Sequence, residues 1–104
     1  MSQYSIAVIV GSLRRDSINQ KLARAIMTTL APPDFLFKEV RISDLPLYNQ
    51  DDDENPADPV RRLKSEIAAA QGIVFVTPEY NRSIPGVLKN VLDHASRPYG
   101  QSVW

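Results

Sequence analysis

The N-terminal third of the sequence has the pattern of a buried strand, a short polar loop and an amphipathic helix. Ser5–Val10 is almost wholly apolar and rich in β-branched residues, which is typical of a strand buried on both faces. From Ser17 or Ile18, apolar residues recur at three- and four-residue steps as far as Leu30, after which two prolines end the helix. This order predicts an α/β fold with a polar loop at a helix N-terminus.

The loop at residues 11–16 has the composition of an anion site. The first amides of a helix lack intrahelical partners and the helix dipole is positive there, so a phosphate fits. The side chains that could contact it are Ser12, Arg14, Arg15, Ser17 and Asn19. The loop has neither the lysine of a nucleoside-triphosphate loop nor the three glycines of a dinucleotide turn, which favours a monophosphate. The alternative is that Ser17 or Asp16 merely caps the helix and the arginines are solvated.

Composition narrows the classes of function. The 104 residues suit one small domain, and twelve basic residues balance twelve acidic ones, so we expect no nucleic-acid partner and no membrane partner. The absence of cysteine excludes disulfides, thiol redox chemistry and cysteine-based metal sites. No apolar segment has membrane-spanning length and the first residues do not resemble a signal peptide, so we expect a cytoplasmic protein.

Two further strand–helix units follow. Phe35–Val40 is a more mixed strand that we place near a sheet edge, and the acidic run at residues 50–55 is expected to be a solvated loop rather than a calcium site. A helix should begin with Asp58 as N-cap and Pro59 at its first position, and end at a glycine cap at Gly72. A strand at residues 73–76 and a last helix after Gly86, which residues 96–100 end, complete the pattern.

Alternation of strands and helices predicts a parallel sheet with right-handed crossovers. In the doubly wound, flavodoxin-like order the first strand lies between the second and third, and ligands bind where the carboxyl ends of the first and third strands meet. The loops Gly11–Asn19 and Pro78–Asn81 should therefore lie side by side. Together they suit a planar heteroaromatic ring with a phosphate tail. The alternative for the second loop is a simple turn, with Tyr80 packed and Asn81 in a left-handed conformation.

Several spaced motifs carry a family resemblance over essentially the whole chain. They are Gly11-Ser12-Leu13-Arg14 with Ser17 and Asn19, Leu45-Pro46-Leu47-Tyr48, Thr77-Pro78-Glu79-Tyr80-Asn81 with Ser83, Pro85-Gly86-Val87-Leu88-Lys89-Asn90, and Asp93-His94-Ala95-Ser96-Arg97-Pro98. The sequence resembles the NADPH-dependent FMN reductase family of the flavodoxin-like superfamily, which includes chromate, quinone and azo-dye reductases.

The resemblance implies an FMN site. Its cofactor-binding residues would be Ser12, Leu13, Arg14, Ser17, Ile18, Asn19, Pro78, Glu79, Tyr80 and Asn81. Among them Ser12, Arg14, Ser17 and Asn19 would surround the phosphate. Pro78, Glu79, Tyr80 and Asn81 would line the isoalloxazine, with backbone amides facing its polar edge. Hydride would pass from NADPH or NADH to the flavin and then to a small-molecule acceptor in a ping-pong cycle. No catalytic side chain and no metal are implied, and relatives form dimers or tetramers.

Three features depart from the family pattern. Arg82 replaces an aromatic residue or histidine, and could meet a nicotinamide-nucleotide phosphate, a neighbouring subunit or solvent. His94 replaces tryptophan, and we expect it to be packed and hydrogen-bonded rather than a metal ligand. Members also carry two further strands and a third FMN loop. We therefore expect residues 1–104 to be the N-terminal part of a single flavodoxin-like FMN-binding domain, its first three β-α units.

The sequence favours an FMN-dependent NAD(P)H oxidoreductase over two alternatives. A flavodoxin-type electron carrier would be acidic and would lack the Arg14–Arg15 pair in its first loop. A truncated, non-catalytic interaction module would account for the missing third FMN loop. The acceptor could be a quinone, a free flavin or a similar molecule.

Overall fold

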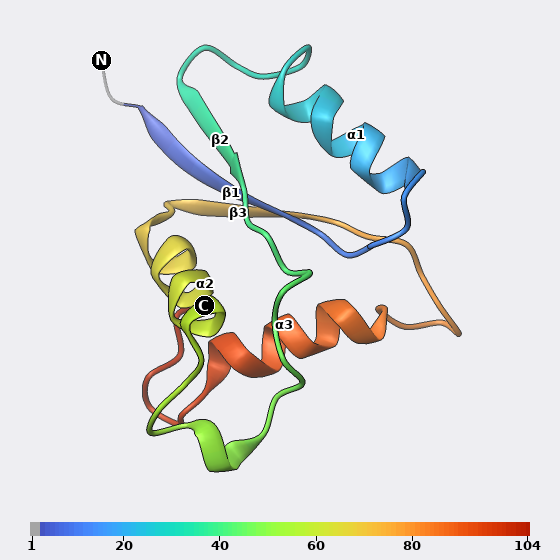
Figure 1. Ribbon diagram of the computed structural model, residues 1–104. Helices are drawn as coiled ribbons and strands as arrows, with labels where there is room; N and C mark the ends of the chain where they lie inside the picture. The colour runs from blue at the N-terminus through green and yellow to red at the C-terminus, as the bar shows by residue number, and fades with distance from the viewer. Residues whose placement is uncertain (1–2) are drawn as a thin grey trace.

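The computed structural model describes residues 3–104 and contains a three-layered α/β arrangement (Figure 1). Its elements are β1 Tyr4–Val10, α1 Ile18–Met27, β2 Phe35–Glu39, the 3₁₀ helix η1 Gln50–Asp52, α2 Asp58–Ala69, β3 Gly72–Val76 and α3 Gly86–Ser96. The predicted alternation of three strands and three helices is confirmed.

The three strands form one parallel sheet in the order β2-β1-β3. Val8 of β1 pairs with Glu39 on one side and with Val74 on the other. The chain leaves β1, forms β2 at one edge and then returns to form β3 at the other, so the direction of winding reverses at β1. This is the expected flavodoxin-like order, with β1 between its two neighbours.

Alternate residues of β1 pack on opposite faces of the sheet. Val8 and Val10 contact α1, whereas Ala7 and Ile9 join a larger core with α2 and α3. Figure 1 shows α1 on one side of the strands and α2 and α3 on the other. Only the second half of β1 is buried on both faces, because Tyr4 and Ser5 remain exposed. Nearly all of β2 is exposed, as expected of an edge strand.

Three predicted helix boundaries were wrong. Helix α1 ends at Met27 rather than near Leu30, because both the amide and the hydroxyl of Thr28 bond to the Arg24 carbonyl and close the last turn. Asp58 lies inside the first turn of α2, and Ala57 occupies the N-cap without a side-chain bond. Gly72 begins β3 instead of capping α2, whose C-cap is Ala70 in an extended conformation.

The acidic run is more ordered than predicted. Gln50–Asp52 forms a 3₁₀ turn in which the Asn49 side chain accepts a hydrogen bond from the Asp51 amide. Its remaining acidic side chains are exposed, except that the half-buried Asp53 carboxylate accepts a hydrogen bond from the Tyr48 hydroxyl at 2.9 Å. The run therefore supports the segment that precedes it.

Helix α3 holds the segment after β2 in place. The Asn90 side chain accepts a hydrogen bond from the Tyr48 amide at 2.8 Å and donates one to the Pro46 carbonyl at 2.9 Å. His94 is buried, with Nε2 2.7 Å from the same carbonyl, and its ring packs edge-on against Tyr48. The prediction that His94 is packed and hydrogen-bonded is confirmed. Burial, together with the bond to Asp53, raises the pKa of Tyr48 above its usual value, so this phenol is protonated at neutral pH.

None of the helices within residues 3–104 is long and apolar enough to cross a membrane.

Candidate functional site

The loops after β1 and β3 meet at Gly11. We call residues 11–17 the first loop and residues 77–85 the second loop. The Gly11 amide donates a hydrogen bond to the Val76 carbonyl at 2.8 Å, so the first loop begins against the end of β3. A Cβ at Gly11 would lie 2.5 Å from Thr77 Oγ1 and 3.3 Å from Leu88 Cδ2. The two loops are therefore side by side, as predicted from the strand order.

Glycine at position 11 is required for space rather than for a left-handed conformation, because the φ of Gly11 lies outside the left-handed region. Position 11 must lack a side chain, because the Thr77 side chain occupies the space that a Cβ would need. Thr77 is a site residue that sequence reasoning missed, since nothing in the motif shows which residue of the second loop faces Gly11.

Ser17 is the N-cap of α1. It is buried and extended, with φ −62° and ψ 125°, and its hydroxyl oxygen accepts a hydrogen bond from the Gln20 amide at 3.2 Å. Its own amide donates to the Arg14 carbonyl at 3.2 Å, which closes the first loop onto the helix. Ser17 therefore caps the helix, and this leaves its hydroxyl proton available for a ligand.

The first loop presents unpaired amides at the positive end of α1. Among residues 3–104, no hydrogen bond uses the backbone amides of residues 12–16. The amides of Ile18 and Asn19 lie in the first helical turn, where no intrahelical acceptor exists. A run of donors at a helix N-terminus is the arrangement that binds phosphate.

Side chains around this run differ in exposure. Ser12 and Asn19 are half-buried, whereas Arg14 is exposed. Leu13 and Ile18 are large apolar residues that are 55% and 73% exposed. The four residues predicted around the phosphate, Ser12, Arg14, Ser17 and Asn19, thus lie in or beside the first loop, with the charge of Arg14 accessible from solvent.

The second loop contains a tight two-residue turn. Tyr80 and Ser83 exchange a pair of backbone hydrogen bonds of 2.9 and 3.0 Å, and the residues between them, Asn81 and Arg82, have φ values of 53° and 65°. Two positive φ values are characteristic of a type I′ turn. The Glu79 carboxylate supports the turn by accepting a hydrogen bond from the Arg82 amide at 3.1 Å.

The turn leaves an aromatic face and two amides accessible. Within residues 3–104, the amides of Tyr80, Arg82 and Ser83 have acceptors, but no hydrogen bond uses those of Glu79 and Asn81. The Tyr80 side chain is 54% exposed, so the expectation that it would pack in the turn alternative is wrong, whereas the left-handed conformation of Asn81 is confirmed. Free amides beside an exposed ring suit the polar edge of a flat heterocycle.

Replacing Arg82 by glycine should stabilise the chain. A non-glycine residue at positive φ costs about 1–2 kcal/mol, and glycine removes most of that cost while adding backbone entropy in the unfolded state. We expect Arg82→Gly to raise the free energy of unfolding by about 0.5–1 kcal/mol, measured by urea denaturation. Arg82→Lys is the matched control and should leave it unchanged. A glycine variant no more stable than the lysine variant would contradict a strained turn.

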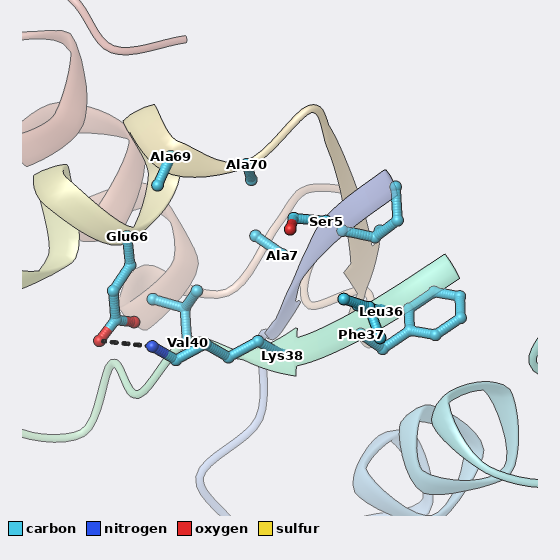
Figure 2. A pocket seen from close by; sticks show the side chains of 10 residues that line it. Ser5, Ala7, Leu36, Phe37, Lys38, Val40, Glu66, Ala69 and Ala70 are labelled. Carbon is cyan, nitrogen blue, oxygen red and sulfur yellow. Dashed lines mark ion pairs between the residues drawn. The ribbon is translucent and has the colours of Figure 1, made fainter. Parts of the chain in front are cut away.

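A hollow of about 250 Å³ beside β2 is separate from the two loops (Figure 2). It is lined mainly by apolar and small side chains, and Figure 2 shows the Lys38–Glu66 ion pair beside it. None of the ten predicted site residues lines it. It therefore takes no part in the candidate site.

The order of the strands and the meeting of the two loops together define a class of protein. A parallel sheet in the order β2-β1-β3, with a polar loop at the N-terminus of α1 and a second polar loop meeting beyond β1 and β3, is a flavodoxin-like α/β arrangement. The fold and the pairing of the loops both follow the sequence-based expectation.

Comparison with solved structures agrees with this class. A flavoenzyme NAD(P)H:(acceptor) oxidoreductase, FerB from Paracoccus denitrificans, superposes with a TM-score of 0.89 at 46% identity, over 97% of this chain and 55% of that one. An apo-form NADH:FMN oxidoreductase, EMOB, superposes with a TM-score of 0.70 at 32% identity, over 88% of this chain and 50% of that one.

Sequence comparison identifies the family. The family described as NADPH-dependent FMN reductase matches residues 4–104. A 2-hydroxy-1,4-benzoquinone reductase of a Burkholderia species is 62% identical over 95% of this chain and 54% of its own length. A quinone reductase of Pseudomonas putida is 56% identical over 100% of this chain and 56% of its own length. The chain belongs to the NADPH-dependent FMN reductase family and spans about half the length of these curated relatives.

Proposed function

We propose that this chain binds FMN as part of an NAD(P)H oxidoreductase that reduces a quinone, a free flavin or a similar small acceptor. The observation that carries the proposal is the meeting of two loops with unpaired amides at Gly11, one of them at a helix N-terminus. A molecule with a phosphate at one end and a flat polar ring at the other matches both loops. The residues present therefore fit FMN.

The first loop would hold the phosphate. Its amides and the N-terminus of α1 supply neutral donors and a positive dipole. Ser12, Ser17 and Asn19 would add side-chain donors, and the Arg14 guanidinium would add a charge that matches two phosphate oxygens. Because Ser17 also caps the N-terminus of α1, phosphate binding and helix capping would use the same hydroxyl group.

The second loop would orient the ring system. Pro78 and Tyr80 would line its faces, and the free amides of Glu79 and Asn81 would meet its polar edge. Bound FMN supplies the chemistry that carries a hydride equivalent from NADPH or NADH to the acceptor. The protein side chains bind and orient, and we assign none of them as a nucleophile or general base.

The alternatives gain no support. A flavodoxin-type carrier was expected to be acidic, whereas this chain has no net charge and carries Arg14 in its first loop. Curated relatives are named as reductases, which supports the enzyme over an interaction module.

Further parts of the proposal extend beyond the described site. We propose that residues 1–104 supply the first three β-α units of a single FMN-binding domain, as half-coverage of the relatives suggests. Assembly as a homodimer or homotetramer and a cytoplasmic location remain predictions.

A titration of FMN with the chain tests the proposal. We expect saturable quenching of flavin fluorescence, because the two loops hold both ends of the molecule. Riboflavin, which lacks the phosphate, should bind at least about tenfold more weakly, since charge-assisted hydrogen bonds contribute roughly 1.5–3 kcal/mol. Circular dichroism before titration verifies folding. No saturable quenching by the folded chain, or equal affinity for riboflavin, would overturn the assigned site.

A further inference from the structure

A second, basic cleft lies on the other side of the first loop. The sheet order places the end of β3 on one side of this loop and the end of β2 on the other. On the β2 side, the first loop, α1 and the segment that follows β2 enclose a cleft of about 470 Å³. It shares Ser12, Leu13 and Arg14 with the FMN site but has no residue of the second loop.

The cleft concentrates positive charge, although the chain as a whole has no net charge. Glu39 is the one carboxylate that lines the cleft. Four arginines line it, namely Arg14, Arg15, Arg24 and Arg41. Glu39 accepts a hydrogen bond from the Gln20 side chain at 2.6 Å and forms no ion pair within residues 3–104. Three net positive charges therefore face one space.

These arginines are not used by the fold. Among residues 3–104, the guanidinium groups of Arg14, Arg15 and Arg24 form no hydrogen bond or ion pair, and Arg41 bonds only to the neighbouring Ser43 hydroxyl at 3.2 Å. By contrast, Arg62 on α2 pairs with Asp44 at 3.0 Å and with Glu66 at 3.5 Å. Like charges that share a cleft repel one another. An anionic ligand bound among them would offset that repulsion by its attraction to each arginine.

The positive charge of this cleft is greater than one FMN phosphate would require. Its single phosphate would be held by the amides of the first loop and by Arg14, and its ring would extend toward the second loop, away from Arg24 and Arg41. NADPH carries a pyrophosphate and a further 2′-phosphate, and several arginine forks in one cleft match several phosphates.

We propose, on the basis of the function proposed above, that the β2-side cleft binds the phosphates of the adenosine half of NADPH. Arg24 and Arg41 recognise the 2′-phosphate, which makes them specificity residues for NADPH over NADH. The dinucleotide lies across the first loop, with its nicotinamide on the side of the second loop.

Equilibrium binding of nucleotide fragments tests the proposal without any redox reaction. By isothermal titration calorimetry, the chain should bind 2′,5′-ADP at least about tenfold more tightly than 5′-AMP, because one charge-assisted contact accounts for a factor of that size. The double variant Arg24→Gln, Arg41→Gln should bind both equally. Arg41→Lys, which keeps the charge but loses the fork, should retain part of the preference. Lys21→Gln removes one charge from α1 outside the cleft and should change nothing.

The outcomes separate this proposal from the one on which it rests. FMN affinity should be the same in all these variants. In the FMN-loaded chain, the ratio of kcat/KM for NADPH to that for NADH should fall in the double variant as the fragment preference does. Equal binding of 2′,5′-ADP and 5′-AMP by the wild-type chain would overturn the cleft assignment even if FMN binds. Inorganic phosphate that competes for the cleft as strongly as 2′,5′-ADP does would overturn it too. Failure to bind FMN with the fragment preference intact would instead overturn the flavin site.

Discussion

Gly11→Ala is expected to destabilise the chain and to weaken FMN binding, because the added methyl group has no space. Its carbon would lie 2.5 Å from Thr77 Oγ1 and 2.9 Å from Thr77 Cβ, so one loop must move. Overpacking of this kind costs about 1–3 kcal/mol. Urea denaturation measures the loss of stability, and FMN fluorescence quenching measures the loss of affinity.

Gly86→Ala is the matched control. A Cβ at Gly86 meets nothing within 4 Å and its φ is not positive, so alanine should leave stability unchanged or raise it by about 0.4–1 kcal/mol. Adding Thr77→Ala to Gly11→Ala removes the oxygen at 2.5 Å but leaves the carbon at 2.9 Å, and should restore stability only in part. If Gly11→Ala behaved like Gly86→Ala, the loops could separate at no cost and their close approach would not define the site.

Arg14→Ala should weaken FMN binding by about 1.5–3 kcal/mol, or roughly tenfold to a hundredfold, because it removes a charge-assisted contact to the phosphate. Arg14 is exposed, so stability should change little. Riboflavin affinity should also be unchanged, since that ligand carries no phosphate. The loss should be smaller at high salt, because the contact lies near solvent.

Arg15→Ala provides the comparison for Arg14→Ala. It removes the same charge from the adjacent position but is not assigned to the FMN phosphate, so its effect on FMN affinity should be well below that of Arg14→Ala. Equal effects would mean that the first loop attracts the phosphate only by its general charge. An unchanged dissociation constant for Arg14→Ala would remove Arg14 from the site.

The sequence predicted the arrangement of elements better than their ends. Apolar runs and three- to four-residue periodicity set which segments become strands and helices, and the flavodoxin-like order then brought the two loops together. Helix ends depend on competition among nearby hydrogen-bonding groups. Thr28 closed α1 early, and sheet pairing drew Gly72 into β3 where a cap was expected.

Contacts between distant residues were beyond the reach of the sequence pattern. The need for glycine at position 11 comes from a side chain at position 77, and no local signal links the two. The basic cleft has the same origin. Arg24 and Arg41 are unremarkable as single surface residues, and only the packing of α1 beside the end of β2 places them in one space.

The hold of α3 on the segment after β2 has a mechanical consequence. Helix α3 starts directly after the second loop, and its Asn90 bonds to Tyr48, 42 residues earlier in the sequence. A helix moves as a rod, so a shift of its first turn carries Asn90 and His94 with it and pulls on the carbonyl of Pro46. The second loop and the segment at residues 46–48 are therefore joined through one helix, so a displacement of the loop that shifts α3 also shifts that segment.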